Sequence, residues 1–225
     1  MKVECGVSAV IFDMDGVLLD TEKVYLESCC AAAEEMGIGD VSDVCVSCIG
    51  ITAEATKKKF LEVFGGEEEC ERFWDISRRI TRERLSKSIP VKPGGRELLQ
   101  YLYDNGVPMA LASSTKTEIV IRELISVDLF GFFTRIIGGD MVKSSKPDPE
   151  IFLTAASSLG VTPDECIVIE DSKNGILAAS SAGMTAFLVP DLVVPDDEML
   201  KRSARVMDSL FDVISYFTDA QEERP

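Results

Sequence analysis

Short apolar runs alternate with helix-like segments along most of this chain. Runs of strand length cover residues 7–12, 107–112, 134–137, 166–169 and 185–189. Between several of them, apolar residues recur at helical spacing, over residues 116–125, 150–159 and 175–182. Strands rich in valine and isoleucine that alternate with helices indicate an α/β fold, in which helices cover both faces of a parallel sheet. In such a three-layer αβα fold, ligands bind at the carboxyl ends of the strands.

One long segment interrupts this alternation. Helical patterns cover residues 25–36, 54–64 and 71–85, and a charged turn at residues 65–71 separates the last two. Proline and glycine at residues 90–95 mark the return to alternating strands and helices. We therefore predict two domains, an α/β core formed by residues 1–18 and 90–225, and an inserted α-helical domain formed by residues 19–89.

The charge balance excludes several kinds of partner. Among 225 residues, 39 are acidic and 23 are basic, which gives a formal net charge of -16. Such a surface repels nucleic acid and anionic membranes, so we expect neither as a partner. It also repels phosphate esters, so a site that binds them must gather positive charge locally.

The seven cysteines do not form the regular spacing of a disulfide framework, and the chain has no histidine. Cys45 and Cys48 form a C-x-x-C pair, which is compatible with half a zinc site, a redox pair or two reduced apolar side chains. No apolar run approaches the ~20 residues of a membrane span, and the first residues do not resemble a signal peptide. We therefore expect a reduced, cytoplasmic protein that is a monomer or a weak oligomer.

Two pairs of acids follow predicted strands. Asp13 and Asp15 come directly after the first strand, and Glu170 and Asp171 come after the strand at residues 166–169. Carboxylate oxygens are the ligands that Mg²⁺ prefers. A solvated turn is the alternative for each pair, because acids and glycine are common there.

Two further segments offer groups that suit phosphate. Ser113 and Ser114 end a predicted strand and precede a helix, whose free N–H groups favour an anion. An ordinary helix cap is the alternative. Lys146 precedes a Pro-x-Pro segment that begins another helix, so its ammonium can extend over the strand ends, or it can be an ordinary solvated lysine.

All four segments lie at strand ends, which meet at one edge of a parallel sheet. Four carboxylates, those of Asp13, Asp15, Glu170 and Asp171, contribute -4, and the Lys146 ammonium returns only +1. A bound Mg²⁺ and a proton on Asp15 would make the site neutral before a phosphate dianion arrives. The sequence therefore predicts Mg²⁺ as a cofactor.

These four motifs, in this order, resemble the haloacid dehalogenase-like (HAD) hydrolase superfamily, and in particular its β-phosphoglucomutase and phosphatase branch. The resemblance covers essentially the whole chain, through Asp13-Met14-Asp15-Gly16, Ser113, Lys146 and Glu170-Asp171. It implies a Rossmann-like core with the inserted helices as a cap domain. It also implies a Mg²⁺-dependent phosphatase that hydrolyses a small phosphorylated metabolite, with a sugar phosphate as the expected class.

The resemblance also implies a role for each residue. Asp13 attacks phosphorus and becomes an aspartyl phosphate, while Asp15 acts as general acid and then general base. Ser113 and the Ser114 backbone N–H hold phosphoryl oxygens, and the Lys146 ammonium neutralises the transferring group.

For the metal, the resemblance implies the Asp13 carboxylate, the Asp15 carbonyl and Asp171, with support from Glu170 directly or through water.

Two departures bear on the reaction. Where the mutases have a histidine and an arginine that grip the sugar phosphate, this chain has Tyr25 and Ala53. Loss of these cations favours a phosphatase over a phosphosugar mutase. Basic residues elsewhere in the predicted cap could compensate, namely Lys57, Arg78, Arg79 and Arg82. A non-catalytic scaffold is a third alternative, but it would be expected to lack a motif residue, and none is missing.

Overall fold

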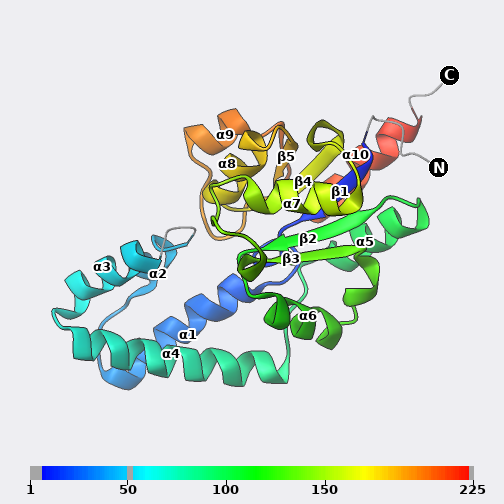
Figure 1. The fold of residues 1–225 in the computed structure, drawn as a ribbon. Helices are drawn as coiled ribbons and strands as arrows, with labels where there is room; N and C mark the ends of the chain where they lie inside the picture. The colour runs from blue at the N-terminus through cyan, green and yellow to red at the C-terminus, as the bar shows by residue number, and fades with distance from the viewer. Residues whose placement is uncertain (1–6, 50–52, 223–225) are drawn as a thin grey trace. The chain divides into compact units, whose positions relative to one another are not determined.

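The computed structural model describes residues 7–49 and 53–222. The chain divides into two compact units, Met1–Leu19 with Val91–Pro225, and Asp20–Pro90. We call the first the core unit and the second the helical unit (Figure 1).

The core unit contains a six-stranded sheet in which every neighbouring pair of strands is parallel. Its central strands are fully buried because they are covered on both faces and consist almost entirely of apolar residues. In spatial order the strands are β3 (Arg135–Gly138), β2 (Met109–Ser113), β1 (Ala9–Phe12), β4 (Cys166–Glu170), β5 (Thr185–Leu188) and β6 (Arg205–Val206).

Helices cover both faces of this sheet (Figure 1). The helices of the core unit are α5 (Gly95–Asp104), α6 (Thr117–Ser126), α7 (Glu150–Leu159), α8 (Lys173–Ser181), α9 (Asp197–Arg202) and α10 (Leu210–Glu222), with 3₁₀ turns at Phe130–Phe132, Gly139–Met141 and Pro163–Glu165. Alternate residues of β1 point to opposite faces, so Ala9 and Ile11 pack in one cluster with residues of α7, α8 and α9. On the other face, the centroid of the Tyr216 ring of α10 lies 5.0 Å from that of the Phe187 ring. The predicted α/β fold with three layers is confirmed.

The strand order reverses at β1. The chain leaves β1 for β2 and β3 on one side, and later forms β4, β5 and β6 on the other side. The carboxyl ends of the three central strands lie close together, because Phe12 ends β1 and pairs with Leu111 and Ile169, which lie two residues and one residue before the ends of β2 and β4. Residues that follow β1, β2 and β4 therefore meet at the point where ligands bind in open α/β sheets.

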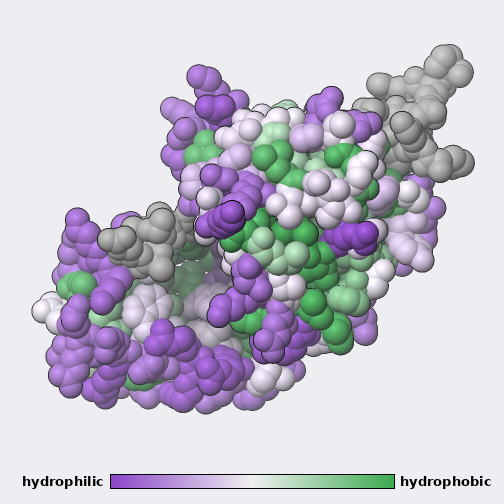
Figure 2. All heavy atoms as spheres, in the orientation of Figure 1, coloured by the Kyte–Doolittle hydropathy of each residue, from purple (hydrophilic) through white to green (hydrophobic). Residues whose placement is uncertain are grey.

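In its described residues, the helical unit packs four helices around an aromatic cluster. They are α1 (Thr21–Met36), α2 (Ser42–Val46), α3 (Ala53–Phe64) and α4 (Glu67–Lys87). Phe60 and Phe73 are fully buried, and the Trp74 ring lies 4.6 Å from that of Phe60. Hydrophilic side chains cover the visible surface of α4 (Figure 2).

The charged turn that we predicted at residues 65–71 is wrong in most of its length, because α4 already begins at Glu67. Its first turn carries Glu67, Glu68 and Glu69. Negative side chains are favourable at that end, where the helix dipole is positive.

The cysteines of the C-x-x-C pair are free thiols in the helical unit. Together with Cys29, Phe60 and Trp74 they line a cavity of about 230 Å³. A hydrogen bond from Cys45, with a second from Ser77, lowers the pKa of Cys29 to about 7 against the opposing effect of burial. No cysteine belongs to a group of three close metal-ligating side chains within the described part of the chain.

No helix among the residues that the structure describes is both long enough and apolar enough to cross a membrane.

Candidate active site

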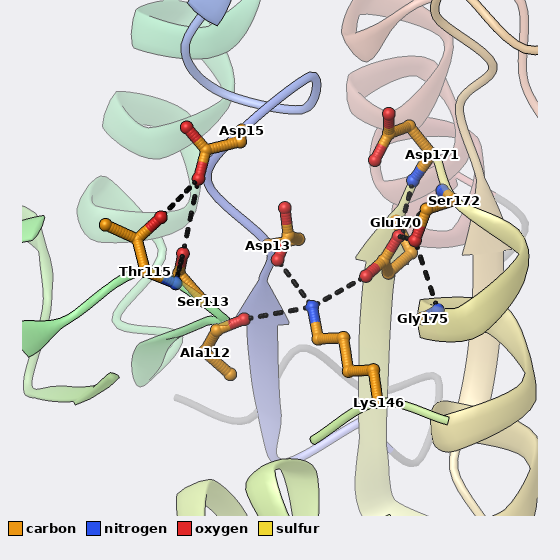
Figure 3. A network of polar contacts seen from close by, with 10 residues as sticks. All are labelled: Asp13, Asp15, Ala112, Ser113, Thr115, Lys146, Glu170, Asp171, Ser172 and Gly175. Carbon is orange, nitrogen blue, oxygen red and sulfur yellow. Dashed lines mark hydrogen bonds and ion pairs between the residues drawn. The ribbon is translucent and has the colours of Figure 1, made fainter. Parts of the chain in front are cut away.

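The predicted site residues other than Ser114 meet at the carboxyl edge of the central strands (Figure 3). Asp13 follows β1, Ser113 ends β2 and Glu170 ends β4. Lys146 comes from the loop before α7, and its peptide bond to Pro147 is cis. Asp13 lies between Asp15 on one side and Glu170 with Asp171 on the other.

Lys146 is the centre of a buried ionic network. Its ammonium lies 2.5 Å from Asp13 Oδ1 and 2.7 Å from Glu170 Oε1, and it donates to the Ala112 carbonyl at 3.3 Å. The side chain is only 6% exposed. Burial alone would lower the pKa of Lys146, but the two carboxylates raise it above its ordinary value. The ammonium therefore remains charged, and the solvated lysine that we considered as an alternative is excluded.

Asp13 has an unusual electrostatic environment for a carboxyl group. Burial raises its pKa to about 7, with further upward contributions from Glu170 and Asp15 and an opposing one from Lys146. Lys146 holds Oδ1, whereas Oδ2 has no hydrogen-bond partner among the described residues. A cation beside the Asp13 carboxyl group would lower its pKa and so favour the carboxylate.

Glu170 is fixed through both of its oxygens. Oε1 contacts Lys146, and Oε2 accepts hydrogen bonds from the backbone N–H groups of Asp171 and Ser172 and from the Ser172 hydroxyl. Close approach of α8 requires Gly175, because a Cβ atom there would lie 1.6 Å from Oε1. With both oxygens engaged, Glu170 is suited to hold Lys146 and not to ligate a metal directly.

The hydroxyl groups after β2 contact Asp15. Asp15 Oδ2 accepts hydrogen bonds from the Thr115 hydroxyl at 3.0 Å and from the Ser113 hydroxyl at 3.4 Å. The N-terminus of α6 is instead satisfied by Asp140, which accepts from the Thr117 N–H at 2.7 Å. Neither Ser113 nor Ser114 therefore acts as the ordinary helix cap that we considered, and Ser114 is exposed.

Asp171 is buried and closely approached by the turn after β1. Gly16 has a φ of +81°, and a Cβ atom at this residue would lie 2.3 Å from Asp171 Oδ2. The glycine of the Asp-x-Asp-Gly motif therefore has two physical reasons to be glycine, the left-handed backbone and the neighbouring carboxylate.

The sequence analysis missed two residues of this region, Thr115 and Asp191. Thr115 belongs to the Ser-Ser-Thr segment but was not singled out from it. Asp191 follows β5 without any motif, and its Oδ1 lies 2.5 Å from the Lys92 ammonium. A carboxylate oxygen of Asp191 lies within 4.8 Å of one of Asp171. Burial is what distinguishes Asp191 from other acids, and burial depends on the folded sheet and cannot be seen in the sequence.

The donor set fits Mg²⁺. The core unit offers hard carboxylate oxygens at Asp13 and Asp171, which suit this ion. A second observation, which does not depend on residue type, also fits a cation here. Asp191 Oδ2 is buried and has no hydrogen-bond partner among the described residues. The four predicted carboxylates together carry more negative charge than the single Lys146 ammonium can neutralise. A divalent cation would therefore also balance the charge of the site.

Fold and site together define an α/β enzyme with carboxylate chemistry at the point where a parallel sheet reverses its strand order. The family model described as haloacid dehalogenase-like hydrolase matches residues 10–189. The chain belongs to this family of hydrolases.

Individual relatives agree with the family match. The phosphorylated carbohydrates phosphatase of Thermotoga maritima is 36% identical over 179 residues, which cover 78% of this chain and 82% of that protein. A Drosophila melanogaster protein named "Probable pseudouridine-5'-phosphatase" is 33% identical over 94% of this chain and 93% of its own length. The crystal structure of β-phosphoglucomutase from Clostridium difficile has a TM-score of 0.72 and 29% identity, and covers 97% of this chain and 100% of that one. The prediction of an enzyme of the phosphatase class is confirmed.

Proposed function

We propose that this protein hydrolyses a small phosphorylated metabolite, with a sugar phosphate as the expected class, through an aspartyl phosphate on Asp13. The observation that carries the proposal is the buried Asp13 carboxylate, whose Oδ1 is held by Lys146 while Oδ2 has no partner among the described residues. A carboxylate oxygen in this setting is a positioned nucleophile. The named phosphatases among the relatives support the reaction class.

In the first step Asp13 Oδ2 forms a bond to phosphorus, and the bond from phosphorus to the ester oxygen breaks. Asp15 donates its proton to the departing alcohol. In the second step Asp15 takes a proton from water, the water oxygen bonds to phosphorus, and the Asp13–phosphorus bond breaks. The products are the alcohol and inorganic phosphate, and Asp13 and Asp15 return to their starting states.

The surrounding residues position these two acids. Thr115 and Ser113 orient the Asp15 carboxyl group through its Oδ2. Lys146 balances the charge of Asp13 and of the phosphoryl group, and Glu170 holds Lys146. Ser113 and the Ser114 N–H are the proposed contacts for phosphoryl oxygens.

Asp13, the Asp15 carbonyl and Asp171 would hold Mg²⁺, with Glu170 in a supporting role. When bound, Mg²⁺ supplies positive charge that attracts the substrate phosphate and stabilises charge in the transition state. We further propose that the helical unit acts as a cap that sets substrate preference, as the family resemblance implies.

A phosphosugar mutase is the second candidate, and the likeness to a β-phosphoglucomutase structure favours it. The side chain of Ala53, one of the two positions at which we compared the chain with the mutases, lies outside the described residues. Three of the basic side chains that could compensate are paired with neighbouring acids. Lys57 pairs with Glu67, Arg78 with Asp75, and Arg79 with Glu35 and Glu83. We therefore favour the phosphatase.

The test is phosphate release from a panel of sugar, nucleoside and glycolytic phosphates, with Mg²⁺ and then with a chelator. The comparison includes Asp13→Asn and the matched control Asp208→Asn, which changes an exposed acid of the core unit. We expect release that requires both Mg²⁺ and Asp13 and is unchanged in the control. Conversion of a sugar phosphate to its isomer, dependent on a bisphosphate and without release of phosphate, would instead establish the mutase.

A further inference from the structure

Asp191 lies at the active-site edge of the sheet although it belongs to none of the four motifs. It follows β5 by three residues, and β5 is the neighbour of β4. The chain stays paired with β4 beyond the strand, because the Val189 N–H donates to the Glu170 carbonyl at 2.8 Å. This hydrogen bond places the segment that contains Asp191 beside Glu170 and Asp171.

Lys92 fixes one oxygen of this carboxylate. The Lys92 ammonium lies 2.5 Å from Asp191 Oδ1, and the two side chains are 19% and 10% exposed. The lysine is itself anchored, because its backbone N–H donates to the Leu18 carbonyl at 2.8 Å. An ion pair with so little solvent exposure holds the Asp191 carboxylate in one orientation.

The second oxygen has no comparable partner. Asp191 Oδ2 is buried and makes no hydrogen bond within the described part of the chain. Leaving a buried polar atom of this kind unsatisfied costs about 1–3 kcal/mol, and more when the group is charged. Such atoms in native proteins are normally satisfied by water or an ion. A carboxylate oxygen of Asp191 lies within 4.8 Å of one of Asp171, so the Asp191 carboxylate is a near neighbour of the proposed metal ligand.

We propose that Asp191 is a positioning residue for the divalent cation, and that its Oδ2 accepts a hydrogen bond from a water molecule on that cation. The inference rests on the proposed function, since it assumes that Asp171 ligates Mg²⁺. Mg²⁺ keeps several waters in protein sites, and these waters need acceptors in the surrounding protein. Because Lys92 neutralises Asp191 and occupies Oδ1, the remaining oxygen is better suited to accept from water than to replace it.

The experiment is calorimetric titration of the full chain with Mg²⁺ in the absence of substrate. Outer partners of metal ligands typically contribute about 10–100-fold to metal affinity. We therefore expect Asp191→Asn to weaken Mg²⁺ binding by about 10–100-fold. The control Asp208→Asn removes the same charge from an exposed residue of the core unit and should bind Mg²⁺ as the wild type does.

A double variant separates the role of Oδ2 from a simple charge effect. In Asp191→Asn the Lys92 ammonium loses the negative charge of Asp191, and its positive charge would repel Mg²⁺ more strongly. The variant Lys92→Met with Asp191→Asn removes that ammonium, and we expect its affinity to remain at least 10-fold below that of the wild type. Thermal melting in chelator would establish that each variant is folded before titration.

Three results would overturn the inference. An affinity of Asp191→Asn within twofold of the wild type would show that Oδ2 holds only ordinary water. Wild-type affinity in the double variant would show that the positive charge of Lys92, and not the loss of Oδ2, weakened Mg²⁺ binding in Asp191→Asn. Absence of Mg²⁺ binding by the wild type would overturn the proposed cofactor as well, and so differs from failure of the inference alone.

Discussion

Replacement of Lys146 by methionine tests the buried network at the centre of the site. Methionine keeps most of the apolar stem but removes the ammonium that contacts Asp13 and Glu170. These carboxylate side chains are only 10% and 1% exposed, so water cannot replace the lost partner fully. Breaking a buried pair by removing one partner costs about 3–5 kcal/mol. We expect Lys146→Met to lose this much of the free energy of unfolding.

The loss should also depend on pH. Burial raises the pKa of Asp13 and the Lys146 ammonium lowers it, and the net result is a pKa of about 7. Without Lys146 the pKa of Asp13 rises further above its unfolded value, so ionisation of Asp13 favours the unfolded chain more strongly. The wild-type Asp13 ionises at about pH 7, whereas in the variant it stays protonated to higher pH, so the deficit of Lys146→Met should grow as pH rises above about 7.

The assay is urea unfolding in chelator, followed by circular dichroism. The Trp74 fluorescence would report the helical unit and not the core, because Trp74 is the sole tryptophan of the chain. The control is Lys143→Met, which removes an exposed lysine from the same loop and should change stability by less than about 0.5 kcal/mol.

A second variant makes the reasoning stricter. Adding Glu170→Gln to Lys146→Met removes one buried charge, and the amide oxygen can still accept from the Asp171 and Ser172 N–H groups. The double variant should recover at least about 1 kcal/mol relative to Lys146→Met. A single variant within about 1 kcal/mol of the wild type at pH 8 would refute the argument for a buried ionic network.

Three further predictions concern single residues of the core unit. Gly16→Ala should reduce kcat by about 100-fold, because a Cβ atom would displace Asp171, whereas Gly106→Ala, with φ +67° and open space, should lose only about 1–2 kcal/mol of stability. Thr115→Val should lower kcat about 10–100-fold, because it removes a hydrogen bond of 3.0 Å to Asp15, and Thr115→Ser should restore most of the rate. Burial raises the pKa of Glu123 to about 7, so its ionisation costs stability as pH rises from 4 to 8. Glu123→Gln should gain up to about 3 kcal/mol over that range in urea unfolding, and a difference that does not change with pH would contradict the assignment.

The strands of the core could be predicted because they are buried on both faces and therefore nearly all apolar. Strand β6 could not, since Arg205 and Val206 are both exposed and the strand has two residues. Helix α2 was missed for a similar reason, because its five residues include no buried one and show no apolar periodicity.

The candidate site was predictable only where chemistry follows a strand directly. Asp13 and Glu170 are placed by β1 and β4, so a position in the sequence translates into a position at the sheet edge. Asp191 depends instead on a loop that pairs with β4 after β5 ends and on a lysine 99 residues away. Neither contact leaves a periodic pattern in the sequence.

The most direct test of the central claim is to trap the covalent intermediate. The protein would be mixed with a substrate from the panel, quenched in acid during turnover, treated with borohydride to reduce an acyl phosphate, and digested for mass spectrometry. The account predicts that modification falls on Asp13 and is absent from Asp13→Asn, which should also release no phosphate. Turnover without modification of Asp13, together with undiminished phosphate release by Asp13→Asn, would contradict it.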